Sequence, residues 1–453
     1  MTRKRISAFL GLAMLAAPAL HAQAQPQDSV PLTLDQALRT AQENNPTYRR
    51  ALTEVGTAEA GIRRARGAFL PGAQLRLSAN GSYSRVFTGQ GQYGEPVERD
   101  DALELKSSSS SQSLSLGSLT LFDGGARLRD LRAAREGAGA TEARVGAAEI
   151  TVRGDVSRRY WEAVRADRVI RLEEQLLASA RDRLEVTRAL VRVGVRGPID
   201  VLGAEVTVAE QEQALELARG NARKAQLDLR QAMGVIQGGW LRLTDEPVAM
   251  FDPAALDADA LVQRALASHP RIARVDAVRR QTDHQVASAR AARWPRFGVS
   301  ANLGRSQRFS NYAGFLEPNP LDQSLGLSFD LTVPLFNGYQ TSYQIQAARA
   351  NRDAATEDAR GERLAVEREV RGAVVDLDNA YRAAVNADRA LGLNRRRLEL
   401  AQQQYRVGAL TLTDLTDAVE RAARAERDAL RTRFDFATAL ATLEERLGGP
   451  VRP

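Results

Sequence analysis

Two aspartates near the C-terminal end of the chain, Asp414 and Asp417, are placed where their carboxylates could act together on a cation. Their spacing of three residues brings both side chains to one face of a helix. Asp414 also suits a simpler role, because acidic residues are favoured at a helix N-cap or in the first turn. Asp200 recurs at the matching earlier place, whereas Gly203 stands where Asp417 would have its counterpart. Asp417 is therefore the stronger functional candidate.

No catalytic or metal-binding motif accompanies these carboxylates. The chain has no cysteine, which excludes disulfides, thiolate metal sites and cysteine nucleophiles. His269 and His284 lie in helical contexts without a zinc, serine-nucleophile or nucleotide-binding signature around them. We therefore expect a protein that is not an enzyme and that uses no cofactor and no resident metal.

The turn that precedes Asp414 occurs twice in the chain. Arg192 and Arg406 each begin the sequence Arg-Val-Gly and lie 214 residues apart, as Asp200 and Asp414 do. The segments "LFDGG" and "LFNGY" keep the same offset. Constant spacing of this kind indicates an internal duplication. We expect a first repeat at 25–234, a linker at 235–256, a second repeat at 257–449 and a tail at 450–453.

The N-terminal segment 1–24 has the pattern of a secretory signal peptide. "TRKR" is basic, "ISAFLGLAMLAAPAL" is apolar and "AQA" offers small residues for cleavage. An uncleaved membrane anchor is the alternative for this segment. No later stretch approaches ~18 consecutive apolar residues, so we expect an exported protein without a helical anchor. Beyond the segment, 60 basic and 56 acidic residues are interspersed, which argues against nucleic-acid binding.

Each repeat predicts two short helices that end at prolines, two strands, one long helix and one returning helix. No proline occurs at 126–191 or at 340–407, and ~65 helical residues span roughly 100 Å. The long helices are expected to turn at tips 193–199 and 407–413. The returning helices should end at Gly234 and Gly448, which suit C-caps. The second of them has a narrow apolar stripe of coiled-coil type.

The four expected strands alternate apolar and polar residues, which predicts one apolar and one polar face. They lie at about 72–88, 112–123, 296–309 and 323–336, with a bulge near Gly117 and a flexible loop at Ser107–Ser111. A soluble sheet packed on helices would alternate in the same way. In an exported chain, strands of ~9–11 residues or more favour a membrane β-barrel. Because four strands cannot close a barrel and open edges are prohibitive in lipid, several copies must pool their strands.

These features together resemble the TolC-type outer-membrane efflux family. The residues that carry the resemblance are the paired "LDQAL…NNP" and "ALVQRAL…HP" openings, "LFDGG" and "PLFNG", and the tips "VGVRGPIDVLGA" and "VGALTLTDLTDA". The resemblance covers about 32–448. It implies an α+β membrane protein. It also implies a homotrimer, in which each protomer contributes four strands to a shared twelve-stranded outer-membrane barrel. Long antiparallel coiled-coil helices would form a periplasmic tunnel, the passive exit duct of a tripartite efflux or type I secretion system.

The resemblance also implies partners. They are a periplasmic adaptor (membrane fusion) protein, an inner-membrane transporter of the RND, ABC or MFS class, and outer-membrane lipid. The alternative expectation is a soluble periplasmic coiled-coil scaffold or adaptor.

Site residues follow from the same resemblance. Asp414 and Asp417 match the acidic residues of the periplasmic gate, where copies would converge, attract cations and raise some of their own pKa values. Asp200 and Tyr405 match the network that closes the tips. The family's network also contains an arginine at the position of Leu410, and Arg196 is the candidate substitute for it. The adaptor-docking tips are expected at Val193, Gly194, Arg196, Gly197, Val407, Gly408 and Leu410.

Overall fold

The computed structural model describes residues 31–84, 88–90, 93, 96–98, 104–235, 239–247, 249–309 and 323–451. The expected signal peptide at 1–24 lies outside these residues. The helices are α1 (Leu34–Asn44), α2 (Pro46–Gly67), α3 (Ala126–Arg192), α4 (Pro198–Met233), α5 (Ala258–Ser268), α6 (Pro270–Ala291), α7 (Gln340–Arg406) and α8 (Leu412–Leu447), with a 3-10 turn η1 at Pro253–Ala255.

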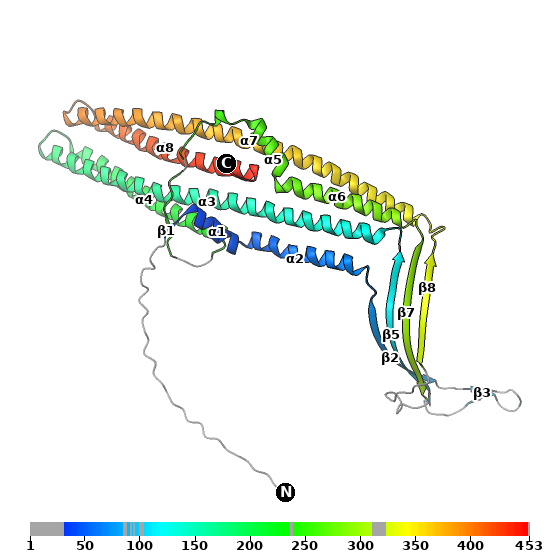
Figure 1. The fold of residues 1–453 in the computed structure, drawn as a ribbon. Coiled ribbons are helices and arrows are strands. Elements are labelled where there is room, and N and C mark those ends of the chain that lie inside the picture. The colour runs from blue at the N-terminus through cyan, green and yellow to red at the C-terminus, as the bar shows by residue number, and fades with distance from the viewer. Residues whose placement is uncertain are drawn as a thin grey trace, which may run out of the picture.

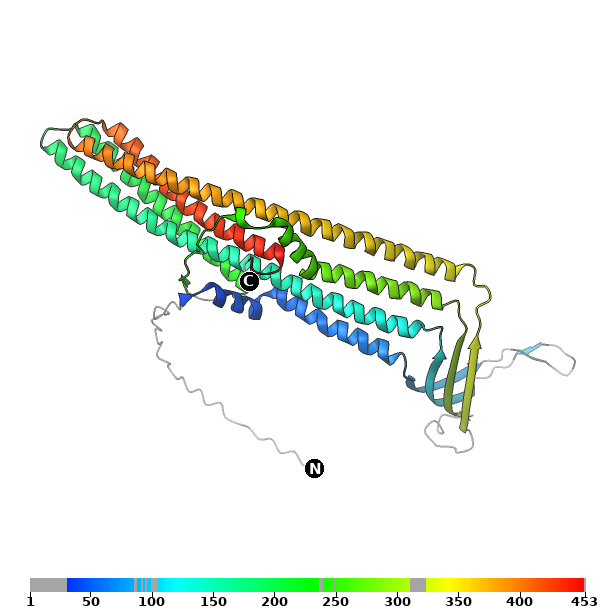
Figure 2. The same ribbon diagram turned by 45° about the horizontal axis from the view of Figure 1, so that its top comes forward.

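The molecule is a long rod of helices with a sheet at one end and two helical tips at the other (Figure 1). The long helices α3 and α7 run its whole length. In the half near the sheet, α2, α3, α6 and α7 lie side by side in that order (Figure 2). In the half near the tips, α3 packs on α4 and α8, and α8 packs on α7. Each long helix therefore changes neighbours at the middle of the rod, where α1 and α5 also pack.

Equivalent helices have equal lengths. Both α3 and α7 have 67 residues, or roughly 100 Å, and α4 and α8 each have 36. The returning helices end at Gly234 and Gly448, whose left-handed backbone (φ of 75° and 77°) closes the last turn without a Cβ penalty. Among the described residues, no helix combines the length and the apolar character needed to cross a membrane.

The "LFDGG" and "LFNGY" segments form the turns from strand to long helix. Two successive residues in each turn have positive φ, Gly124 and Gly125 in the first and Gly338 and Tyr339 in the second. At Gly124 a side chain would also meet Trp294 Cβ at 2.8 Å. These turns let the chain pass from the sheet into the rod, and they account for the motif.

Four strands form one antiparallel sheet in the order β2-β5-β7-β8. They are β2 (Ala73–Ser84), β5 (Glu104–Phe122), β7 (Arg296–Phe309) and β8 (Gln323–Thr332). Two-residue strands β1 (Pro31–Leu32) and β6 (Arg242–Leu243) pair at the middle of the rod, and β3 (Thr88–Gln90) pairs with β4 (Pro96–Glu98). The expected slip near Gly117 is confirmed by a register shift between Leu116 and Leu119.

The expected loop at Ser107–Ser111 is wrong. These serines lie in β5, which begins at Glu104 rather than near residue 112 and pairs with β2 and β7 on its two sides. Pairing on both edges supplies hydrogen bonds to the backbone, so the sheet overrides the weak strand preference of a serine run. Strand β8 is shorter than expected because it ends at Thr332, ahead of Pro334, which cannot donate to a sheet.

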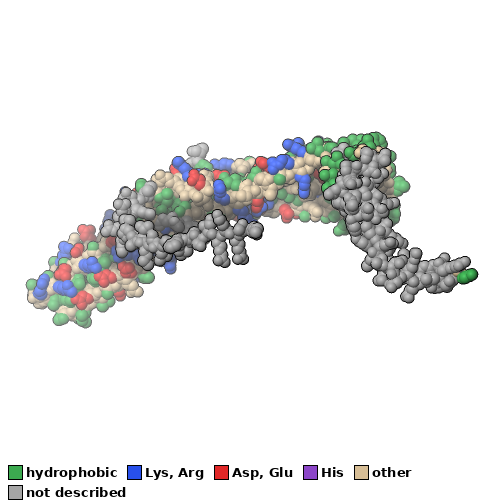
Figure 3. Space-filling view, turned by 90° about the horizontal axis from the view of Figure 1, so that it is seen from below, with side chains coloured by type: hydrophobic (Ala, Val, Ile, Leu, Met, Phe, Trp, Pro, Cys, Tyr) green, Lys and Arg blue, Asp and Glu red, His purple; other side chains and the backbone are tan. Residues whose placement is uncertain are grey.

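One face of the sheet is apolar and exposed. Rows of apolar side chains cross the strands; one row joins Leu75, Leu114, Leu303 and Leu325, and another joins Leu119, Val299 and Phe329. Hydrophobic side chains gather at this end of the molecule, whereas the rod has mixed charge (Figure 3). The large exposed side chains on β2 and β8 are Leu75, Leu77, Leu325, Leu327, Phe329 and Leu331. No helix of the described chain packs on this face.

The buried core lies at the middle of the rod. One cluster surrounds Tyr160 and Trp161 of α3, and a second surrounds Phe436 of α8 and Leu377 of α7. Most of the apolar stripe expected on the second returning helix is buried in these clusters or near the tip. A third, smaller cluster, which contains Tyr405 and Leu415, packs the helices next to the tips.

Candidate gate at the helix tips

Glycine ends both long helices at the tips. In the first tip, the Val195 amide donates a hydrogen bond of 3.0 Å to the Leu190 carbonyl. Gly194, which precedes Val195, has a φ of 74°. The second tip repeats this arrangement around Gly408, with φ of 77°. This is the Schellman closure of a helix, and it explains why Arg-Val-Gly occurs twice. The turns comprise residues 193–197 and 407–411, slightly shorter than expected.

Asp414 takes part in the cap of the returning helix α8. Its backbone amide donates to Thr411 Oγ1 at 3.2 Å, and the Thr411 hydroxyl donates to the Asp414 carboxylate at 2.6 Å. Asp200 lies in the matching first turn of α4, which starts at Pro198. Both aspartates thus occupy positions where the helix macrodipole favours a negative charge.

Arg196 connects the two tips. Its guanidinium donates to the backbone carbonyls of Tyr405 (3.2 Å) and Leu410 (2.8 Å) and lies 4.3 Å from the centre of the Tyr405 ring. Tyr405 is only 4% exposed. A single side chain of the first tip therefore holds the second tip through two hydrogen bonds and one cation–π contact.

The structure brings Arg196, Tyr405 and Leu410 together but does not bring Asp200 to them. Within the described part of the protomer, the Asp200 carboxylate has no ion pair or side-chain hydrogen bond. Leu410 takes part through its carbonyl rather than its side chain. Arg196 Nε and Tyr405 Oη are buried without a hydrogen-bond partner.

Asp417 lies between two arginines. Its carboxylate accepts from Arg421 at 2.8 Å and from Arg397 at 3.1 Å. The Arg421 hydrogen bond, followed by the charges of both arginines, holds the pKa of Asp417 below its usual value. The pKa increase expected for converging carboxylates is therefore opposed within the protomer.

These arginine partners were missed in the sequence. Arg421 follows Asp417 by four residues on the same helix, a spacing that could have identified it. Arg397 comes from α7, and only the packing of α7 on α8 brings it to Asp417. Thr411 was the third residue missed, although threonine before a helix is a common N-cap.

The remaining tip residues differ in exposure. Val193 and Val407 are 71% and 78% exposed, and Gly194, Gly197 and Gly408 are exposed as well. Arg196 and Leu410 are half-buried because they form the contact between the tips. Among the described residues, no group of three or more His, Cys, Asp or Glu side chains could hold a metal within one protomer.

An exposed apolar sheet, a rod of helices and two joined tips are the features expected of a membrane protein with a long helical extension. Residues 37–235 and 261–449 match the family described as outer membrane efflux protein. The match covers most of the chain, which therefore belongs to this family. The resemblance noted in the sequence is confirmed, and the family is one of passive channels rather than enzymes.

Individual relatives and structures agree with this assignment. Protein CyaE of Bordetella pertussis is 28% identical over 348 residues, which cover 74% of this chain and 68% of that protein. Outer membrane protein TolC of Escherichia coli K12 is 23% identical over 429 residues, covering 92% and 82%. A solved structure of CusC shares the fold with a TM-score of 0.77 at 18% identity, covering 93% of each chain.

The protein is thus an efflux or secretion channel of the Gram-negative outer membrane. This location does not fit the alternative of a soluble periplasmic scaffold.

Proposed function

We propose that three copies of this chain form one passive export duct, with a shared twelve-stranded barrel in the outer membrane and a helical tunnel in the periplasm. The observation that carries the proposal is the uncovered sheet. Its apolar face is exposed, and β2 and β8 each pair with one neighbour only among the described strands. A sheet with one lipid-like face and two open edges needs further strands to close it.

The number of strands supports the trimer. Four strands are fewer than the ~8 of the smallest membrane barrels. Joining β2 of one protomer to β8 of the next repeats the antiparallel pattern around a ring. The relatedness to trimeric channels of this family favours three copies.

Sedimentation of the detergent-solubilised protein, with the solvent density matched to the detergent, tests this assembly. We expect the mass of three 49.4 kDa chains, less the signal peptide. A monomer in mild detergent would overturn the shared barrel.

We further propose that the tips dock a periplasmic adaptor, which joins the duct to an inner-membrane transporter. The tips lie at the end of the rod opposite the sheet, roughly 100 Å away. Exposed apolar side chains at Val193 and Val407 offer a surface that a partner could cover.

Cysteine crosslinking tests the docking end, since the chain has no native cysteine. We expect Val407→Cys to crosslink to a co-expressed adaptor. The control is Tyr93→Cys at the sheet end, where Tyr93 is 90% exposed. Equal or stronger crosslinking from the control would show that the orientation is reversed.

A further inference from the structure

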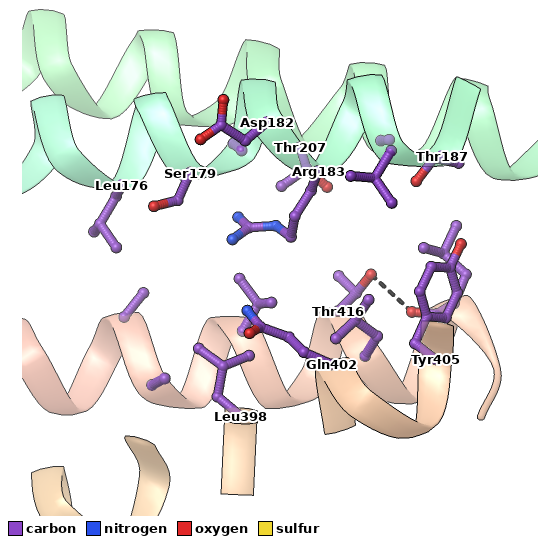
Figure 4. Close-up of a pocket in the computed structure, with 18 of the residues that line it drawn as sticks. Leu176, Ser179, Asp182, Arg183, Thr187, Thr207, Leu398, Gln402, Tyr405 and Thr416 are labelled. Atoms are coloured by element: carbon purple, nitrogen blue, oxygen red, sulfur yellow. Dashed lines mark hydrogen bonds between the residues drawn. The ribbon is translucent and has the colours of Figure 1, made fainter. Parts of the chain in front are cut away.

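A cavity of about 340 Å³ lies between the two helical hairpins, just inside the tips. All four helices of the hairpins line it, α3 and α4 on one side and α7 and α8 on the other (Figure 4). Most of the lining is apolar, including Leu176, Leu398, Leu415 and Val419. This size is at the lower end of the ~300–1,000 Å³ typical of small-molecule sites.

Arg183 extends from α3 into this cavity, toward Gln402 of α7 (Figure 4). Within the described chain its guanidinium has no ion pair and no hydrogen bond, although neighbouring arginines of α3 do. Arg181 pairs with Glu212 at 2.7 Å and Arg188 pairs with Glu205 at 2.8 Å. Burial lowers the pKa of Arg183, against the opposing charge of Asp182.

The carboxylates of the cavity wall do not neutralise Arg183. Asp182 points away from the guanidinium (Figure 4), and Glu426 is bound by Arg395 at 3.0 Å. Arg183 is half-buried and its guanidinium has no partner among the described residues, so an anion that entered the cavity would supply the missing hydrogen-bond acceptors.

A second polar group of the wall also lacks a partner. Tyr405 lines the cavity, and its hydroxyl is buried without a hydrogen bond. Gln402 and Thr187 add further donors along the same wall. The lining thus combines apolar side chains with polar ones, and Arg406 of α7 adds a second positive charge to the wall. Ligand sites pair an apolar surface with polar groups that fix orientation.

We propose that this cavity binds a small organic carboxylate with an apolar body, with the carboxylate on Arg183 and the body against the leucines of α7 and α8. Guanidinium and carboxylate groups form paired, charge-assisted hydrogen bonds, which fixes the orientation of the ligand. Because both hairpins line the cavity, the bound molecule contacts both. The proposal concerns binding alone and is independent of the cargo of the channel.

Calorimetric titration of the full-length protein in detergent, against a protein-free detergent reference, tests the proposal. The probe is 2-naphthoate, and the neutral 2-naphthamide of the same shape is the ligand control. We expect naphthoate to bind the wild type and to bind Arg183→Gln at least tenfold more weakly. Arg183→Lys keeps the charge without the paired donors and should lie between them.

The matched protein control is Arg181→Gln, which removes an arginine of the same helix that pairs with Glu212 outside the cavity lining. Its affinity for naphthoate should equal that of the wild type. Arg183→Gln should fold, because it removes an unpartnered charge rather than a contact. Absence of binding to the wild type, equal binding to Arg183→Gln, or equal affinity for the amide would each overturn the site.

Discussion

At the residue scale, Arg196 is the contact to test first, because among the described residues it donates both hydrogen bonds from the first tip to backbone carbonyls of the second. Hydrogen bonds from charged groups contribute about 1.5–3 kcal/mol and a cation–π contact about 0.5–1 kcal/mol. Arg196→Gln should therefore shift the tips toward separation more than tenfold and raise single-channel conductance in planar bilayers. Arg192→Gln, at the end of α3 just before the tip, is the control. Unchanged conductance in Arg196→Gln would show that the contact does not close the channel.

Asp417 gives a prediction about charge. We expect Asp417→Asn to reduce cation selectivity and block by a multivalent hexaammine cation, because Arg397 and Arg421 would then lack their counter-charge. Asp200→Asn, in the matching tip, should change both less. Reversal potentials in planar bilayers measure the selectivity. Since the pKa of Asp417 is lowered from 3.8, selectivity should persist as the pH falls from about 7 to about 5. Two results would exclude Asp417 from the gate: loss of wild-type selectivity in this pH range, or unchanged selectivity in Asp417→Asn.

The sequence could supply part of this site. The duplicated Arg-Val-Gly turns marked the tips, and the resemblance directed attention to Tyr405 and Arg196. The sequence could not show that Arg196 donates to backbone carbonyls, because every residue has one and the residue type does not indicate which is bound. It also could not distinguish Arg183 from the paired arginines beside it, because pairing depends on which helix lies opposite.

At the element scale, Gly154 shows how closely α3 and α8 approach. A Cβ at this buried position would clash with the side chain of Glu445, whose carboxylate is held by Arg158. We expect Gly154→Ala to destabilise the protein by about 1–3 kcal/mol, despite the better helix propensity of alanine. Gly139→Ala in the same helix, where nothing lies within 4 Å, should stabilise by up to about 1 kcal/mol. Thermal unfolding followed by the helical signal compares them, and equal effects would contradict the close packing.

The start of α6 contains a cap that can titrate. His269 is 4% exposed, and its Nδ1 accepts from the Arg271 amide at 3.1 Å. Burial, followed by the charge of Arg271, lowers its pKa below 6.5. A hydrogen bond with the Glu445 backbone and the charges of Glu369 and Glu362 oppose this shift. The unfolded chain therefore takes up this proton first as the pH falls. The stability from the neutral cap is fully present above pH 6.5 and is lost below it.

We accordingly expect Tm to fall between about pH 7 and about pH 5, and to fall less in His269→Asn. Asparagine is a suitable replacement because Asn45 caps α2 at the equivalent place, accepting from the Thr47 amide at 2.8 Å. His284→Asn, farther along α6, should keep the wild-type fall. If His269→Asn loses as much Tm as the wild type, another group causes the pH dependence.

Element boundaries show where sequence patterns were sufficient. Prolines, glycines and the absence of proline located the helices, since these residues act locally on the backbone. The serine run of β5 was misjudged because its neighbours β2 and β7, distant in sequence, decide its conformation.

At the scale of the whole molecule, closure of the sheet belongs to the assembly rather than to one chain. Alternating residues predicted the two faces, and the exposed apolar rows agree with them. The alternation of apolar and polar residues does not indicate how many copies complete the ring, because that number depends on the angle between protomers. The chain does determine which face meets lipid, and this is open to test.

Phe329 and Ser328 are adjacent in β8 and point to opposite faces of the sheet. Phe329 is 64% exposed and lies opposite Val299 in an apolar row, whereas Ser328 lies opposite Ser300. An arginine on a lipid-facing strand costs about 2–4 kcal/mol near the bilayer midplane, and a trimer would bear this cost in every copy. We therefore expect Phe329→Arg to prevent insertion into lipid vesicles, measured by flotation, while Ser328→Arg inserts and changes conductance. The opposite result would mean that the polar face meets lipid and that the apolar face lines the duct.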